Sequence, residues 1–143
     1  DLGILLGDLG KSKEAELSIR KAIELKPNFA DFHLNLGNIL RDLGQLQQAE
    51  LSLRKSIELN PSNFLAFNNL GFSHKYKGDF NSAKIFYKKS IDLKYDFIEG
   101  HLNYSTVLLT LKKFNEGFKE YEWRAARGPP ISSRCRARTA PLL

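Results

Sequence analysis

The sequence is poor in residue types on which several protein classes depend. Its 143 residues include no methionine and one cysteine, Cys135, so a disulfide framework within the chain is excluded. No run of about 18 apolar residues occurs, and no basic region opens the chain, so we predict neither a membrane span nor a signal peptide. These absences favour a cytoplasmic location. A chain that starts without methionine is expected to be a piece of a longer protein.

Positive charge is concentrated near one end of the sequence. The net charge is +6, but residues 124–143 contain five arginines and no acidic residue. The rest of the chain has 17 basic and 16 acidic residues, which nearly balance. A nucleic-acid-binding domain is expected to carry a basic stripe on its folded face. We therefore expect no nucleic-acid partner and no membrane partner.

Similar residues recur at a constant spacing through most of the chain, and Leu2 and Leu36 are separated by one such spacing. A fixed period of this length is typical of stacked helix pairs, in which each pair covers the apolar face of its neighbour. We therefore predict an all-α protein, an α-solenoid of antiparallel helix pairs with about three and a half repeats. The positions that recur at this interval are Leu2, Leu36 and Leu70; Gly3, Gly37 and Gly71; Ala15, Ala49, Ala83 and Gly117; and Pro27, Pro61 and Pro129, with Tyr95 between them.

Glycine and proline suggest where each repeat turns and ends. We divide the solenoid, residues 1–128, into a truncated repeat at 1–29 and further repeats at 30–63, 64–97 and 98–128. In the first repeat, a helix over residues 1–9 is expected to stop at Gly10, and a second helix to run from about Ser12 to Lys26. Residues 129–143 lose the helical period and become rich in arginine. We predict a disordered or non-native tail there.

The recurring positions resemble the pattern of the tetratricopeptide repeat (TPR) family. In order, they hold Leu-Gly, then Ala, then a large apolar or aromatic residue, then Ala or Ser, and finally Pro. The resemblance covers residues 1–128 and implies that the first helix of each pair lines a concave, protein-binding groove. The segment FNEGFKEYEWR resembles the final repeat of bacterial family members that continue into another domain. Family members that clamp a C-terminal carboxylate need basic residues where this chain has Leu34 and Glu99. That specificity is therefore not expected.

No set of residues has the spacing of a catalytic, cofactor or metal site. His33 and His101 occupy the same position two repeats apart, and we expect both, like His74, to serve packing. No Cys, His and carboxylate cluster has zinc-ligand spacing. Cys135 has no neighbouring base that could activate it as a nucleophile. We predict a non-enzyme with no cofactor.

The groove implied by the resemblance contains a regular row of amides. Asn35, Asn69 and Asn103 recur at the repeat interval, and a carboxamide can both donate to and accept from a peptide main chain. The row is similar to the asparagine ladder in the repeat region of O-linked N-acetylglucosamine transferase, although asparagine at this position also serves packing or solubility. Asp42 and Glu99 are further groove positions. The groove residues that we predict to bind a peptide are Asn35, Asn38, Arg41, Asn68, Asn69, Phe72, Lys75, Tyr76 and Asn103.

Two functions follow as hypotheses. The first is a protein–protein interaction scaffold that binds an extended peptide or partner segment in the groove. The alternative is a substrate-selecting repeat region of a longer enzyme, such as a glycosyltransferase, with catalysis outside this fragment. Self-association through the N-terminal end is a further expectation, because a truncated first pair would leave apolar surface uncovered.

Overall fold

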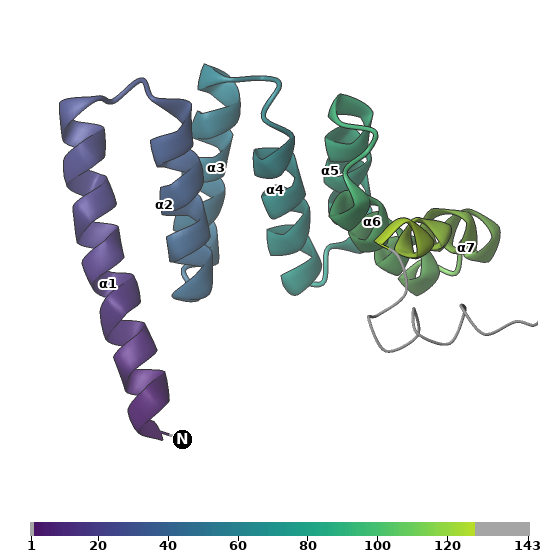
Figure 1. The fold of residues 1–143 in the computed structure, drawn as a ribbon, viewed down its shortest axis with the longest axis horizontal. Coiled ribbons are helices and arrows are strands. Elements are labelled where there is room, and N and C mark those ends of the chain that lie inside the picture. Colours follow the sequence, from purple (N-terminus) through teal and green to yellow (C-terminus); the bar gives the residue numbers. More distant parts are fainter. Residues whose placement is uncertain (1, 128–143) are drawn as a thin grey trace, which may run out of the picture.

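A computed structural model describes residues 2–127, and all the regular elements in that range are helical. The helices form a row with α1 at one end and α7 at the other (Figure 1). Successive helices pack against one another as antiparallel pairs, which confirms the predicted fold class. The predicted tail, 129–143, lies outside the described residues. The elements are α1 (Leu2–Leu25), α2 (Ala30–Asp42), α3 (Leu46–Leu59), α4 (Phe64–Tyr76), α5 (Phe80–Leu93), α6 (Ile98–Thr110), α7 (Phe114–Tyr121) and the 3₁₀ helix η1 (Glu122–Arg127).

The turns inside the last three pairs share one backbone conformation. Gly44, Gly78 and Lys112 occupy equivalent repeat positions and have φ angles of 77°, 81° and 60°. After each of them, the next amide donates back to the last turn of the preceding helix, as Gln45 does to the carbonyl of Leu40 at 2.8 Å. This left-handed helix end suits glycine, which has no Cβ. Lys112 adopts it despite its side chain.

Small residues let the two helices of each pair approach closely. A Cβ added to Gly37 in α2 would lie 2.7 Å from Leu53 in α3, and one added to Gly71 in α4 would lie 2.8 Å from the Tyr87 ring in α5. Leu53 and Tyr87 are fully buried. The contact between a glycine and a large buried side chain therefore forms the centre of both pairs.

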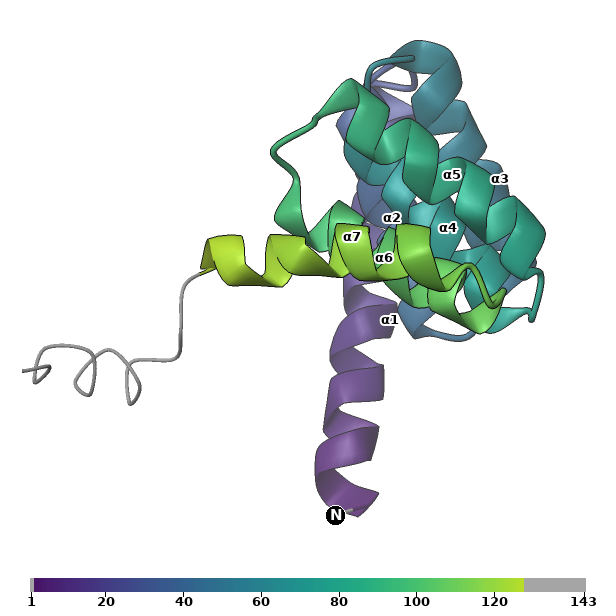
Figure 2. The ribbon, with the colours of Figure 1, turned by 90° about the vertical axis from the view of Figure 1, so that its right-hand side faces the viewer.

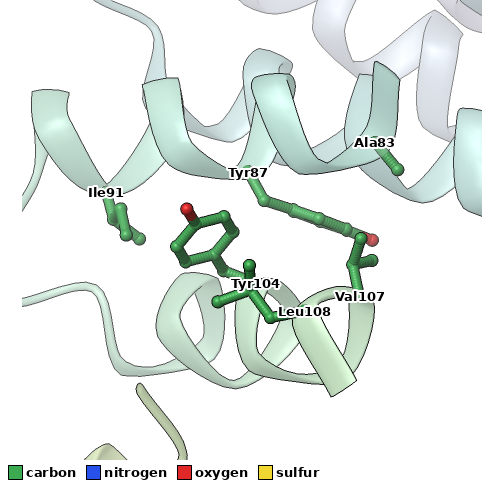
Figure 3. Close-up of a cluster of buried hydrophobic side chains, with 6 residues drawn as sticks. All are labelled: Ala83, Tyr87, Ile91, Tyr104, Val107 and Leu108. Carbon is green, nitrogen blue, oxygen red and sulfur yellow. The ribbon is translucent and has the colours of Figure 1, made fainter. Parts of the chain in front are cut away.

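The core continues from each pair to the next. Ala83, Tyr87 and Ile91 in α5 face Tyr104, Val107 and Leu108 in α6 (Figure 3). Similar clusters connect α2 and α3 with α4, and α1 with α2 and α3. The second helices α3 and α5 lie toward one side of the row, which leaves the first helices to form the other (Figure 2). No helix within residues 2–127 combines the length and apolar character needed to span a bilayer.

The first repeat differs from the prediction. Residues 1–9 were expected to form a separate helix that ends at Gly10, but α1 runs without a break through Gly10 and extends past the end of α2 (Figure 1). Residues 7–11 are exposed, and a Cβ at Gly7 or Gly10 would touch nothing within 4 Å. Because no second helix covers this segment, continuing the helix satisfies its backbone amides at a cost of about 1 kcal/mol per glycine. The predicted turn is therefore wrong.

Candidate peptide-binding groove

One hollow of about 510 Å³ lies on the side of the solenoid formed by the first helices. The end of α2, the length of α4 and the start of α6 contribute most of its lining. We call it the groove hollow. Its lining residues are Arg41, Asp42, Gly44, Leu46, Asn68, Asn69, Phe72, Tyr76, Glu99 and Asn103.

Asparagine pairs bridge neighbouring first helices beside and within this hollow. The Asn69 side-chain amide donates to Asn38 Oδ1 at 2.6 Å, which joins α4 to α2. The Asn103 amide donates to Asn68 Oδ1 at 3.1 Å, which joins α6 to α4. A carboxamide has more hydrogen-bonding capacity than one contact uses. Asn69 Oδ1 also accepts from Arg41 Nη1 at 3.5 Å, and Asn68 is buried.

A cation and two aromatic rings form the wall beside the asparagines. The Arg41 guanidinium carbon lies 4.9 Å from the centroid of the Phe72 ring, a distance typical of cation–π attraction. Arg41 also donates to Asp42 Oδ1 from Nε at 3.1 Å and from Nη2 at 2.9 Å. Tyr76 stacks on Phe72 with ring centroids 6.0 Å apart, and its side chain is 73% exposed. This wall can receive an apolar side chain from a partner.

Most of the predicted groove residues meet in the groove hollow, but some do not. Six of the nine line it, and Lys75 lies just outside with Nζ 5.7 Å from the Phe72 centroid. Asn35 and Asn38 instead line a second hollow of about 500 Å³ against α1. The predicted peptide contacts themselves remain predictions. Gly44 and Leu46 were not predicted to line the groove, because the expectation was restricted to first helices.

The histidines have structural partners in the described part of the chain. His33 Nε2 lies 2.7 Å from the carbonyl oxygen of Pro27, and His74 Nδ1 lies 3.2 Å from Asp79 Oδ2. His101 is buried, with 1% of its surface exposed. Within residues 2–127, no group of three His, Cys, Asp or Glu side chains is arranged to hold a metal ion.

Family profiles match the sequence over the same helix pairs. A profile described as TPR repeat matches residues 37–78, and profiles described as tetratricopeptide repeat match residues 19–50 and residues 1–29 together with 65–97. Together these matches run from residue 1 to residue 97. The chain belongs to the tetratricopeptide repeat family. The TPR pattern thus extends into residues 1–29, where the structure has one continuous helix.

Solved structures of MamA share the TPR fold of this chain. One, described as the crystal structure of MamA, is 24% identical, has a TM-score of 0.74, and aligns over 85% of this chain and 71% of its own. A second MamA structure is 22% identical, with a TM-score of 0.73 and coverage of 99% and 75%. The MamA RS-1 ArsTM double mutant is 19% identical, with a TM-score of 0.73 and coverage of 90% and 74%.

At these identities the likeness to MamA shows the fold alone. Among curated proteins, none matches the sequence. TPR domains generally act as protein-interaction modules and are typically not catalytic.

Proposed function

We propose that this chain is a protein-interaction scaffold whose groove hollow binds an extended segment of a partner protein. The observation that carries the proposal is the hollow itself, in which three first helices present amides, a cation and aromatic rings toward one space. This combination suits a peptide, because its main chain needs hydrogen-bond partners and its side chains need shaped, partly apolar sites.

The usual spacing of packed helices sets the length of the bound segment. Packed helices are about 8–10 Å apart, and an extended chain advances about 3.3 Å per residue. A peptide that crosses from α2 to α6 would therefore span about six residues. Asn69 and Asn103 would contact its main chain, and Phe72 with Tyr76 would hold one apolar or aromatic side chain.

The charges around the hollow indicate what the peptide itself should carry. Arg41 already contacts Asp42, and Glu99 lies in the lining from α6. Because cationic and acidic groups are both present, a strongly acidic or strongly basic peptide would meet like charge at one end. We expect selected partners to be close to neutral, with an aromatic or large aliphatic residue near the middle.

A selection experiment tests this proposal even though the natural partner is unidentified. Peptides selected from a random display library on the chain would be measured by fluorescence anisotropy against the wild type and variants. Phe72→Ala is expected to weaken binding at least tenfold, about 1.4 kcal/mol, because it removes the aromatic anchor. Tyr76→Ser is a milder companion, since the exposed Tyr76 ring contributes little to the core.

Matched controls separate groove binding from binding elsewhere. Asn81→Ala changes an exposed asparagine in the second helix α5 and is expected to leave affinity unchanged. A photo-cross-linking residue at position 76 should capture the peptide, whereas the same residue at the exposed position 85 in α5 should not. Unchanged affinity in Phe72→Ala, together with cross-linking at position 85, would refute the proposal.

A further inference from the structure

The C-terminal helical segment folds back over a buried histidine. His101 in α6 is 1% exposed, and the segment that follows Lys113 brings Glu120 from α7 and Trp123 from η1 against it. The Trp123 and His101 rings stack with centroids 4.1 Å apart and planes 13° apart. Tyr95 stands edge-on to both rings, at 5.5 Å from His101 and 5.2 Å from Trp123.

Both nitrogens of the His101 ring have an oxygen within hydrogen-bonding distance. Nε2 lies 2.7 Å from the carbonyl oxygen of Tyr95, and Nδ1 lies 2.5 Å from Oε2 of Glu120. A carbonyl oxygen can only accept, so Nε2 must carry a hydrogen. If the ring were neutral, Nδ1 would then present a lone pair to the ionised Glu120 oxygen. The short contact therefore requires a proton between them, as in an imidazolium donating to a carboxylate.

Several acidic side chains lie on the helices that pack against α6. Burial is the main cause that raises the pKa of the Tyr104 hydroxyl, and the negative charges of Glu116 and Glu120 in α7 and of Asp92 in α5 raise it further. Tyr104 belongs to α6, and Tyr95 lies in the loop before it. In η1, Arg124 donates to the hydroxyl of Tyr121.

An earlier repeat supplies an internal comparison. His33 occupies the same repeat position and makes the same bond, from its Nε2 to the Pro27 carbonyl oxygen at 2.7 Å. The positions equivalent to Glu120 in the two preceding repeats are Phe86 and Ser52. The bond to the carbonyl therefore accompanies histidine at this repeat position, whereas the carboxylate and the stacked indole occur only in the last of these repeats. The carboxylate of Glu120 and the indole of Trp123 both belong to the FNEGFKEYEWR segment.

We propose that His101, Glu120 and Trp123 form a proton-dependent clasp that holds α7 and η1 against α6. The clasp is closed while His101 carries both ring protons. When rising pH removes the Nδ1 proton, the ring and the carboxylate repel each other, and Glu120 and Trp123 move away from His101. The position of the last helix, with its exposed Phe114 and Phe118, then depends on pH.

Trp123 reports on the clasp directly, because it is the only tryptophan in the chain. Its emission would be followed from about pH 5 to 9, a range that includes the usual titration of histidine. We expect one step, with the emission maximum moving to longer wavelength as the pH rises and the indole becomes exposed to water. Emission that does not change over this range would overturn the proposal.

Two variants and one resonance measurement complete the test. In Glu120→Gln the neutral amide can accept from a protonated Nδ1 or donate to a bare one, so the step should disappear. Glu116→Gln, on the same helix, should retain it. The ¹⁵N resonances of the wild-type His101 ring should show both nitrogens protonated below the step, and a singly protonated ring would also overturn the proposal. An unchanged step in Glu120→Gln would overturn the proposal as well.

Discussion

Glu50 connects one repeat to the next, and its replacement should make that connection measurable. The carboxylate lies in α3 and is 19% exposed. It accepts from Arg54 in its own helix at 2.8 Å and from Lys77, at the end of α4, at 2.7 Å. His74 Nε2 lies 3.5 Å from it. The perturbation is Glu50→Gln, which keeps the size of the side chain and removes its charge.

The magnitude follows from the ionisation of the carboxyl group. The hydrogen bond from Lys77 is the largest cause that lowers the pKa of Glu50, from 4.5 to about 2, against the opposing effect of burial. Such a fall corresponds to roughly 3 kcal/mol of stabilisation of the charged form. Since the site is partly open to water, we expect about 2 kcal/mol. A depressed carboxyl pKa stabilises the fold above about pH 4.5, and this contribution is lost as the pH falls toward 2.

Urea denaturation followed by circular dichroism measures the effect. At pH 7 the Glu50→Gln variant should be about 2 kcal/mol less stable than the wild type, and the difference should shrink as the pH is lowered to about 2.5. Glu58→Gln is the matched control, because Glu58 pairs with Lys55 on the same helix but is 67% exposed, and exposed pairs contribute little. A difference for Glu50→Gln that is below about 0.5 kcal/mol at pH 7, or that does not depend on pH, would refute the reasoning.

Three further substitutions test the backbone and the packing, each by the free energy of unfolding in urea. Lys112→Gly should stabilise the chain by about 1 kcal/mol, because a side chain at a φ of 60° is strained; no gain would contradict that strain. Gly10→Ala should also stabilise by about 1 kcal/mol if α1 is continuous, and should destabilise if the chain turns there. Gly71→Ala should cost about 1–3 kcal/mol, because its Cβ would lie 2.8 Å from the buried Tyr87 ring; a neutral result would mean that the ring moves freely.

The sequence predicted the helix pairs well because their contacts recur at a fixed interval. Gly37 and Gly71 recur at the repeat interval, so a small residue at this position of each pair could be read from the sequence, whereas its contact with Leu53 or Tyr87 is seen only in the structure. The continuous α1 was not readable in this way. Gly10 stands where Gly44 and Gly78 turn the chain, but a turn also needs a packed partner for the helix that precedes it. Gly10 matches the glycines of the later turns in residue type, but in the described first repeat no second helix packs against this segment.

The last repeat shows a second limit of reasoning from repeat positions. His101 was expected to serve packing, and it is buried as expected. Its contacts with Glu120 and Trp123 could not be predicted, because those two residues have no counterparts of similar chemistry in the earlier repeats. The one signal in the sequence was a histidine at this position combined with the YEW sequence at the end of the same repeat.

The asparagines of the groove show why equal spacing in sequence does not mean facing partners in space. Asn35, Asn69 and Asn103 are equivalent by repeat, yet Asn69 bonds Asn38, 31 residues away, and Asn103 bonds Asn68, 35 residues away. Asn38 lies three residues after Asn35, the α2 equivalent of Asn69, whereas Asn68 lies one residue before Asn69, the α4 equivalent of Asn103. The register of the bond therefore differs between the two interfaces. The asparagines of the groove therefore act as hydrogen-bonded pairs. A peptide that binds there must use the hydrogen-bond donors and acceptors that these pairs do not already use. Double-mutant cycles on Asn38 with Asn69, and on Asn68 with Asn103, would measure coupling that a simultaneous change of Asn35, Asn69 and Asn103 would mix together.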